Sequence, residues 1–510
     1  MIDKVSHAQL RHPRPARLVL ACLGIMWAFA SLSADGPPNI ILLMGDDHGW
    51  EETGYNGHAY LHTPVLDEMA ESGLRFDRYY AAHPSCSPTR GSVLTGRHPT
   101  RYGTFAPNWS IRPEEITIAH LLRDAGYTTG HFGKWHVGPV KTTSPTSPGA
   151  MGFDEWLSHD NFFELNPTFS RNGGPPTQLE GEGSAVIIDE TIRFIEESVK
   201  SEKPFLAVVW FGSPHEPYSG LERDLALYDD LPARYADQTV TLTSNLTGLP
   251  IDRPLGDVLR ERYAEITAMD RAIGTLRSFL DGEGLRDNTV LWYSGDNGTP
   301  ASGLAETPLR GLKGTMYEGG IRVPGIIEWP ARISTSRVSD VPVVTSDILP
   351  TVAAFAGLDV PTRPLDGVSL VPLLDDGMPS RPSPIFFWSF DTAGLADREP
   401  VPYIDPALQS GTTPLVKLMN GIPTRVFENV HYRAVDTRDF DGPRAVVDND
   451  YKLVLDGSSG SGTELFDLRD DPGETINLAT SKPGVVEALA QRLRQWQRSA
   501  LHSLTGADYR

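Results

Sequence analysis

Two pairs of acidic or amide residues follow apolar runs, where they could share a cation. Asp46 and Asp47 come after the apolar run 39–44, and Asp296 and Asn297 come after a second apolar run. Three carboxylates gathered at one sheet edge would repel one another unless a cation lay between them. Oxygen ligands alone favour a hard ion, Ca²⁺ first and Mg²⁺ as the alternative. Such residues also favour ordinary turns, so the prediction depends on both pairs following buried strands.

Cys86 begins a segment with the features of a helix N-terminus, and we predict a helix over residues 86–94. Pro88 lies in the first turn, where its missing N–H costs nothing. The free N–H groups and the dipole at such an end favour an anion. Arg90 is four residues after Cys86 and faces the same side. The alternative is that Cys86 is an ordinary free thiol, at the surface or in the core.

Two further predicted strands are followed at once by groups that hold or transfer protons. Lys134 and His136 follow the predicted strand 127–132, and His215 follows the apolar run 205–211. An extended segment presents residues two apart to the same side. Histidine suits proton transfer, since its unperturbed pKa is about 6.5. Ligands of α/β sheets bind beyond the carboxyl ends of the strands, so we expect an active site there.

These segments, in this order, resemble the type I sulfatases. The residues Cys86, Pro88 and Arg90, followed by Thr95 and Gly96, resemble the family's signature. Five further segments are similar to family motifs, at residues 46–49, 133–138, 214–217, 295–298 and 313–324. The resemblance is strong over roughly residues 38–360 and moderate towards the C-terminus. It is to arylsulfatase A-like and N-acetylgalactosamine-6-sulfatase-like members of the alkaline phosphatase superfamily.

The resemblance implies a sulfuric ester hydrolase whose nucleophile is a formylglycine. In that family an enzyme oxidises the signature cysteine, so we expect a formylglycine-generating maturation enzyme as a partner for Cys86. The resemblance also implies a bound Ca²⁺, or Mg²⁺. The expected metal ligands are Asp46, Asp47, Asp296, Asn297 and residue 86. The expected catalytic residues are Cys86, Arg90, Lys134, His136, His215 and Lys313.

A four-step mechanism follows from the resemblance. Metal-bound hydrated formylglycine at position 86 attacks sulfur, and His215, alone or with Lys313, protonates the departing alcohol. A covalent sulfate hemiacetal remains, as in nucleophilic catalysis generally. His136 then removes the proton of the second hydroxyl, so that sulfate leaves and the aldehyde returns. Arg90 and the lysines hold the negative charge in a preorganised pocket. Two alternatives stay open: Lys134 only orients the nucleophile, or His136 is a structural residue.

Two long segments, 141–183 and 391–430, show little periodic pattern and many turn formers. Loops of this length in a compact enzyme are usually functional, so we predict that they shape the substrate site. The predicted substrate-binding residues are His159, Asp160, Asn161 and Arg171, with ordinary loop residues as the alternative. The expected substrate is a sulfated carbohydrate, and the resemblance suggests a galacto-configured sugar sulfate.

Two other functions remain open. The first is a phosphoester or phosphonate hydrolase of the same superfamily. Phosphatases of that superfamily use Ser or Thr nucleophiles and two zinc ions, which Cys86 and a single cluster of oxygen ligands disfavour. The second is an inactive carbohydrate-binding pseudoenzyme, which would bind the saccharide without turnover even after residue 86 had been converted.

The elements that must position these residues alternate along the chain. Apolar runs suit buried strands, and helices are predicted between them, at residues 63–72, 114–125, 185–199 and 263–280. This order predicts an α/β fold, a doubly wound and mostly parallel mixed sheet flanked by helices. The resemblance implies that the fold is alkaline phosphatase-like. We expect a catalytic domain over 35–380 and a smaller C-terminal α+β subdomain with a short antiparallel sheet over 381–510.

Residues 1–34 read as a signal peptide. Four basic residues precede the apolar run 18–27, and residues 28–30 form an A-x-A-like cleavage site. The run is shorter than the ~20 residues that span a bilayer. We expect an exported protein, periplasmic or secreted, without stable membrane insertion; a retained signal anchor is the alternative. Cys22 leaves with the signal, so Cys86 is the one cysteine of the mature chain.

Composition excludes other classes. The chain has 510 residues and a formal net charge of −21, which becomes −24 when the signal, with its net +3, is removed. An acidic protein is not expected to bind nucleic acid, which needs a basic face. With 39% hydrophobic residues the chain is not mostly disordered. Capture of an anionic ester must therefore depend on local groups rather than on the overall field.

Overall fold

The computed structural model describes residues 36–244, 247–303, 306–392, 395, 401–414, 425–432, 434–456 and 462–509. The signal peptide predicted for residues 1–34, with Cys22, lies outside these residues. Residues 38–510 form one compact unit. The domain boundary near residue 380 stays a prediction. No helix in the described part of the chain has the length and hydropathy needed to cross a membrane.

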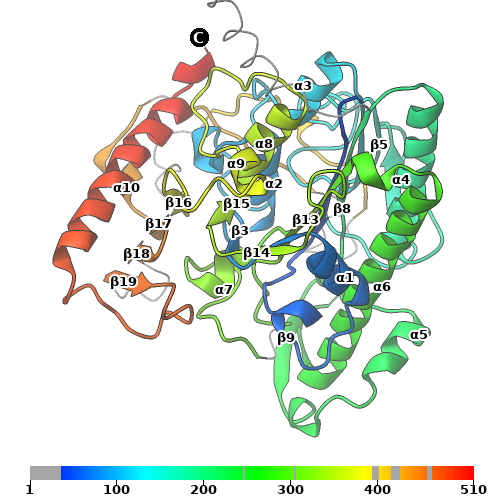
Figure 1. The fold of residues 1–510 in the computed structure, drawn as a ribbon, viewed down its shortest axis with the longest axis horizontal. Helices are drawn as coiled ribbons and strands as arrows, with labels where there is room; N and C mark the ends of the chain where they lie inside the picture. The colour runs from blue at the N-terminus through cyan, green and yellow to red at the C-terminus, as the bar shows by residue number, and fades with distance from the viewer. Residues whose placement is uncertain are drawn as a thin grey trace, which may run out of the picture. The chain divides into compact units, whose positions relative to one another are not determined.

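A ten-stranded mixed sheet forms the centre of this unit (Figure 1). Five neighbouring parallel strands make up its middle. In spatial order they are β11 (Thr289–Gly295), β1 (Asn39–Gly45), β8 (Phe205–Trp210), β4 (Thr128–Lys134) and β5 (Glu155–His159). Most of their residues are buried, because both faces of the sheet are covered. This arrangement confirms the predicted α/β fold.

Shorter strands extend the sheet on both sides, and several of them run antiparallel. Beyond β11 lie β13 (Gly325–Glu328), β2 (Leu74–Phe76) and β14 (Arg337–Ser339). Beyond β5 lie β6 (Thr168–Arg171) and β7 (Thr177–Gln178). Small separate sheets are formed by β3 (Tyr79–Tyr80), β12 (Arg322–Val323) and β15 (Val343–Val344), and by β9 (Thr239–Thr243) and β10 (Pro250–Pro254).

Helices cover both faces of the main sheet. Alternate residues of β1 enter different cores: Leu42 packs in one and Leu43 in the other. The core with Leu42 includes residues of α2 (Cys86–Thr95), α3 (Ile118–Asp124), α8 (Ile348–Phe355) and α9 (Val371–Leu374). The core with Leu43 includes residues of α1 (Pro64–Ser72), α4 (Gly183–Lys200) and α6 (Leu255–Gly282). Two further short helices are α5 (Glu222–Leu225) and α7 (Glu318–Ile321).

The register of the central strands places their carboxyl ends at one edge. Gly45 pairs with Gly295, the last residue of each strand. Lys134 pairs with His159 in the same way. Trp210, the end of β8, lies between Met44 and Gly133. Residues that directly follow these strands therefore emerge side by side.

A second, antiparallel sheet lies towards the C-terminus, as predicted. Its strands are β16 (Ile385–Trp388), β17 (Arg444–Asp448), β18 (Tyr451–Leu455) and β19 (Thr463–Asp467). The last helix, α10 (Pro483–Leu504), buries Leu489, Leu493 and Trp496 in the same core as Trp388. In Figure 1 this helix runs in red beside β16–β19.

Three sequence predictions need correction. The loop interpretation of residues 141–183 is wrong for β5, β6 and β7, because that segment adds strands to the main sheet. The helix predicted over 114–125 begins only at Ile118, since the Thr117 side chain caps it by accepting from the backbone N–H of His120. The helix predicted over 263–280 is the later part of α6, which begins at Leu255.

Candidate active site

The ends of β1 and β11 bring the predicted metal ligands together. The backbone N–H of Asp47 donates to Oδ1 of Asp296 at 2.9 Å. Nδ2 of Asn297 donates to Oδ1 of Asp47 at 2.8 Å. Asp46 and these three residues are all buried. Asp47 has a positive φ of 63°, which lets the chain turn sharply after the strand.

Two oxygens in this group accept no hydrogen bond from the described part of the chain. Oδ1 of Asp46 and Oδ1 of Asn297 are buried and accept no hydrogen bond among the described residues. Burial, together with the charges of Asp296 and Asp47, raises the pKa of Asp46 to about 7 despite nearby Lys134 and Arg90. A cation would supply the missing partner and favour the ionised carboxylate. The oxygen-rich donor set fits a hard divalent ion.

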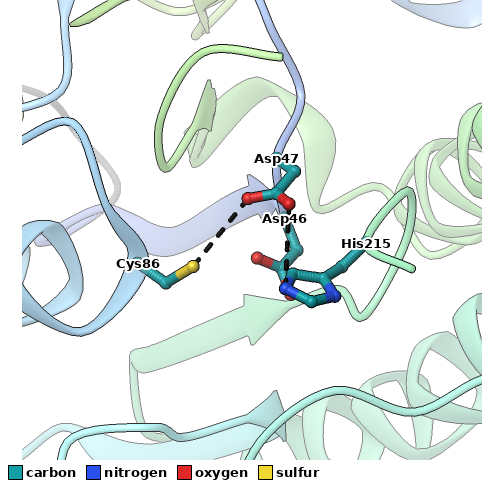
Figure 2. Close-up of side chains that lie close together, drawn as sticks. All are labelled: Asp46, Asp47, Cys86 and His215. Carbon is teal, nitrogen blue, oxygen red and sulfur yellow. Dashed lines mark hydrogen bonds and ion pairs between the residues drawn. The ribbon is translucent and has the colours of Figure 1, made fainter. Parts of the chain in front are cut away.

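Cys86 is the first residue of α2 and faces this cluster. Its Sγ atom lies 3.8 Å from Oδ1 of Asp47 and 3.6 Å from Nζ of Lys313. Asp46, Asp47, Cys86 and His215 each offer a ligand atom, and these atoms all lie within 4.8 Å of one another. Figure 2 shows Cys86 and His215 on opposite sides of the Asp47 carboxylate. Burial raises the pKa of the free Cys86 thiol well above its usual range.

Two lysines hold the paired aspartates. Nζ of Lys134, at the end of β4, lies 2.5 Å from Oδ2 of Asp46. Nζ of Lys313 forms an ion pair with Oδ1 of Asp47. Burial alone would raise the pKa of Asp47, but Lys313, His215 and Lys134 together hold that pKa well below its usual range. The same pairing raises the pKa of Lys313 even though burial opposes it.

The Lys313 loop is fixed between the two halves of the site. The backbone N–H of Lys313 donates to the carbonyl of Thr299 at 3.0 Å, next to the Asp296 turn. The following N–H, from Gly314, donates to the carbonyl of Pro84 at 2.9 Å, just before α2. Gly314 has a φ of 91°, which glycine adopts without strain. These bonds place the ammonium between the nucleophile position and the aspartates.

Arg90, which was predicted to help hold negative charge in the pocket, is fully buried and does not line the cavity. Its guanidinium donates to Oδ2 of Asp296 at 2.7 and 3.2 Å and to the carbonyl of Lys134 at 3.1 Å. It also lies 3.4 Å from Oδ1 of Asp46 and 5.1 Å from the centre of a Trp210 ring. In this position Arg90 orients metal-ligand candidates.

The two predicted catalytic histidines have different partners in the site. Nε2 of His215 lies 3.7 Å from Oδ2 of Asp47, and its Nδ1 bonds the carbonyl of Glu216 at 2.5 Å. Nε2 of His136 lies 2.9 Å from Oδ1 of Asn108, whereas its Nδ1 is buried and has no partner among the described residues. Burial and the nearby charge of Lys134 lower the pKa of His136 well below its usual range.

A cavity of about 220 Å³ joins these groups. Segments far apart in the sequence line it. The lining residues are Cys86, Pro107, Asn108, His136, Asn161, Phe162, His215, Glu216, Thr243, Lys313 and Arg425. The cavity therefore gives access to the predicted nucleophile, to both predicted proton-transfer histidines and to one lysine.

The four predicted substrate-binding residues are not gathered at the cavity. Asn161 lines it, and its Oδ1 has no hydrogen-bond partner among the described residues. His159 is buried at the end of β5, 3.3 Å from the carbonyl of Pro414. Asp160 accepts hydrogen bonds from several backbone N–H groups and has a positioning role. Arg171, on β6, is half exposed and pairs with Glu190.

Sequence reasoning assigned no site role to several residues that line the cavity, among them Asn108, Phe162 and Arg425. Asn108 supports His136, and no motif marked it. Phe162 stacks on His215 with the ring centres 4.6 Å apart and the planes at 11°. Arg425 lies 5.7 Å from the centre of the Phe162 ring. The one usable signal for Arg425 was its place in the pattern-poor segment 391–430, which was predicted to shape the substrate site.

Known proteins are similar in sequence to this chain. A family model described as Sulfatase matches residues 38–358. N-acetylgalactosamine-6-sulfatase of Mus musculus is 31% identical over 414 residues, which cover 74% of this chain and 72% of that protein. Arylsulfatase A of Homo sapiens is 31% identical over 508 residues, which cover 95% of this chain and 90% of that protein.

Solved structures share the fold. The crystal structure of Ps i-CgsB in complex with k-i-k-neocarrahexaose matches with a TM-score of 0.72 at 22% sequence identity. The match covers 91% of this chain and 93% of that chain. The likeness therefore extends through both the main sheet and the C-terminal antiparallel sheet.

Proposed function

Since the chain belongs to the sulfatase family and is a sulfuric ester hydrolase, we propose that it releases inorganic sulfate from a sulfated carbohydrate by means of a formylglycine made from Cys86 and a bound divalent cation. One observation carries the proposal. Cys86 Sγ, Lys313 Nζ and Asp47 Oδ1 converge at one end of a cavity that is also lined by His136 and His215.

The state of the Cys86 thiol supports its conversion. Because burial raises the pKa of this thiol, the unmodified side chain stays protonated and is a poor nucleophile. A formylglycine at this position supplies a hydrated aldehyde whose hydroxyl can attack sulfur. The fold positions this group, because residue 86 begins α2 and faces Asp47 and Lys313. A formylglycine-generating enzyme is then an obligatory maturation partner.

We propose that Asp46, Asp47, Asp296, Asn297 and residue 86 hold the cation. The two buried oxygens without donors, on Asp46 and Asn297, support this ligand set. Ca²⁺ is the proposed ion, with Mg²⁺ as the alternative, because Ca²⁺ tolerates irregular oxygen coordination. Such an ion supplies positive charge that stabilises developing negative charge on oxygen. Arg90 and Lys134 keep the aspartates oriented through their ion pairs.

His215 and Lys313 are the proposed proton donors to the departing alcohol. Only an N–H can donate to a carbonyl, so the Nδ1 of His215 carries a proton and bonds Glu216. Its Nε2 then faces the cavity side, 3.7 Å from Asp47, and gives up a proton when the imidazole is charged. Lys313 retains its protons because its pairing with Asp47 raises its pKa, and it stabilises charge on the leaving oxygen.

His136 is the proposed base for the step that releases sulfate. With the Asn108 amide oxygen as acceptor, Nε2 of His136 carries the proton and Nδ1 has a free lone pair. The lowered pKa of His136 keeps the ring neutral, as a base requires. Nδ1 therefore takes the hydroxyl proton of residue 86 as sulfate leaves.

A galacto-configured sugar sulfate is the proposed substrate. The similarity to N-acetylgalactosamine-6-sulfatase supports this choice. The predicted signal peptide would deliver the enzyme to the periplasm or the exterior, where sulfated polysaccharides are accessible. The long segments that contribute Asn161 and Arg425 to the cavity suit recognition of a saccharide.

The test compares sulfate and phosphate release. The full chain is expressed with a formylglycine-generating enzyme, and matched sulfate and phosphate esters of the same galactosides and phenols are supplied. We expect inorganic sulfate to be released much faster than phosphate, and Cys86→Ala to abolish it. Faster phosphate release would support a phosphoester hydrolase instead, and tight saccharide binding without turnover by converted protein would support a pseudoenzyme.

A further inference from the structure

Arg425 is a cavity-lining cation that the proposed reaction does not use. It is half-buried, and its Nε has no hydrogen-bond partner among the described residues. No acidic side chain in the described part of the chain forms an ion pair with it. Residues 415–424, which precede it in the sequence, contain no Asp or Glu. Burial lowers the pKa of the guanidinium, and among the described residues no carboxylate offsets that cost.

The three aspartates at the strand ends already have cationic partners, and Glu216 is the other carboxylate that lines the cavity. Asp46 pairs with Lys134, Asp47 with Lys313, and Asp296 with Arg90. These ion pairs do not involve Arg425. Arg425 lines the cavity together with Lys313, and it is suited to an anion that arrives with the substrate.

The position of Arg425 places that anion on the leaving-group side. Its guanidinium carbon lies 5.7 Å from the centre of the Phe162 ring, and Phe162 stacks on His215. His215 is the proposed proton donor to the departing alcohol, and Phe162 links Arg425 to this side of the cavity. Cys86, the proposed point of attack, contacts Lys313 and Asp47. It also lies near enough to Arg425 for the two groups to interact electrostatically.

The backbone around Arg425 is fixed by neighbouring segments. The N–H of Gly411 donates to the carbonyl of Arg425 at 2.7 Å. Farther along, the N–H of Glu428 donates to the carbonyl of Asn108 at 2.9 Å, next to the loop that supports His136. Asp160, after β5, accepts N–H bonds from Thr412 and Thr413 at 2.6 and 2.7 Å. The backbone that carries Arg425 is therefore held in place beside the cavity, which reduces the entropy lost on binding.

We propose that Arg425 binds a second anionic group of the sugar substrate, a carboxylate or a further sulfate, in addition to the sulfate that is hydrolysed. The inference rests on the proposed function for the identity of the reacting ester. A planar guanidinium matches both oxyanions through paired N–H donors. The preferred substrate is then a saccharide that carries at least two negative groups rather than an isolated sulfate ester.

The kinetic test uses pairs of galactosides that differ in one group. Each pair shares the hydrolysed sulfate, and one member adds a uronate carboxylate in one series or a second sulfate in the other. For the wild type we expect higher kcat/KM on the dianionic member of one series, which identifies the anion. Arg425→Gln should lower kcat/KM on that member by roughly 10- to 100-fold, the range of a lost charge-assisted hydrogen bond. On 4-nitrophenyl sulfate the change should stay within about threefold.

Two variants sharpen the comparison. Arg425→Lys keeps the charge but loses the paired N–H donors of the guanidinium. We therefore expect its kcat/KM on the dianionic sugar to lie between those of the wild type and Arg425→Gln. Arg438→Gln removes an exposed arginine of the same C-terminal part, which pairs with Asp436, and should behave as wild type. Circular dichroism and thermal unfolding verify that each variant is folded.

A binding arm separates this inference from the proposed reaction. Cys86→Ala cannot be converted to formylglycine, so calorimetry on it measures affinity without turnover. We expect it to bind the dianionic sugar more tightly than the monoanionic one, and Cys86→Ala/Arg425→Gln to lose that difference. Equal affinity for both sugars would overturn the inference, as would an Arg425→Gln loss equal on all sulfates, which would assign Arg425 to the reacting sulfate. If the protein binds the dianionic sugar more tightly but the wild type shows no turnover, the proposed function is wrong and the inference about Arg425 still holds.

Discussion

Arg90 and Asp296 form an ion pair that is wholly removed from solvent, with two N–H groups donating to Oδ2 at 2.7 and 3.2 Å. Arg90 lies one turn after Cys86 on α2, and Asp296 follows β11. The pair therefore fixes the helix that carries the proposed nucleophile against the turn that carries a proposed metal ligand.

Removing Arg90 should destabilise the whole fold. Arg90→Gln leaves the Asp296 carboxylate buried without its cation, and breaking such a pair costs about 3–5 kcal/mol. Urea unfolding measures the change in the free energy of unfolding. The control is Arg171→Gln, whose half-exposed pair with Glu190 should contribute less than about 1 kcal/mol. Equal losses in the two variants would show that the Arg90 pair has no special role.

Removal of the divalent cation should both stop catalysis and loosen the site. Without the ion the Asp46 and Asn297 oxygens lose their proposed partner and three carboxylates repel one another. We expect a chelator to lower the melting temperature and abolish sulfate release, and Ca²⁺ to restore both. In Asn297→Ala the restoring Ca²⁺ concentration should rise. If the chelator changes neither sulfate release nor the melting temperature, the enzyme does not need the proposed cation.

Lys313 should matter most for poor leaving groups. In Lys313→Ala the departing sugar oxygen loses a neighbouring ammonium, so kcat on an unactivated sugar sulfate should fall by at least about 100-fold. On 4-nitrophenyl sulfate, whose phenolate leaves without a proton, the fall should be clearly smaller. The ratio of the two effects is the measured quantity. If the sugar sulfate is hardly affected, or both substrates suffer alike, the leaving-group role is wrong.

Asp366 should make the docking of α10 sensitive to acid. Its carboxylate accepts from Arg101 at 2.7 and 2.8 Å and from Nε1 of Trp496 at 2.7 Å. Burial raises the pKa of Asp366, but Arg101 and the hydrogen bonds lower it more, so the net pKa lies below the usual value. A depressed pKa gives stability that is present above about pH 4 and is lost on acidification.

Asp366→Asn tests this linkage. At pH 7 the variant should be less stable by about 3 kcal/mol, the lower end of the range for breaking a buried pair. From pH 7 to about pH 4 the difference from wild type should stay constant, and below about pH 4 it should shrink, because the unfolded wild-type chain takes up a proton that the folded Asp366 carboxylate resists. Denaturant unfolding from pH 7 towards pH 3 measures it. A difference that stays constant at the acid end as well would contradict the assignment.

Local sequence was sufficient to predict the central sheet and much of the site. The apolar runs before Asp46 and Asp296 and the segment 127–132 before Lys134 were predicted to be strands, and parallel strands align their carboxyl ends. The helix beginning at Cys86 was recognisable from Pro88 near its start and Gly96 just after its end. Local sequence patterns thus placed these residues at strand ends or at a helix N-terminus without any information on tertiary contacts.

The rest depends on contacts that local pattern does not encode. Residues 155–159 carry no long apolar run, and β5 forms because β4 and β6 offer paired backbone groups. Asp160 was predicted to bind substrate, but its oxygens accept N–H bonds from residues more than 250 positions away. Arg425 reaches the cavity through pairing of its segment with residues 108–110 and 409–411. Such long-range pairings are set by the whole fold.

The most direct test is the mass of the tryptic peptide that spans residues 79–90, measured together with sulfate release on the same preparations. Protein expressed with and without a formylglycine-generating enzyme gives a series with different extents of conversion at Cys86. The account predicts that specific activity rises in proportion to the fraction of peptide that carries the aldehyde in place of the thiol. Full sulfatase activity in protein whose peptide contains only the unmodified Cys86 thiol would contradict it.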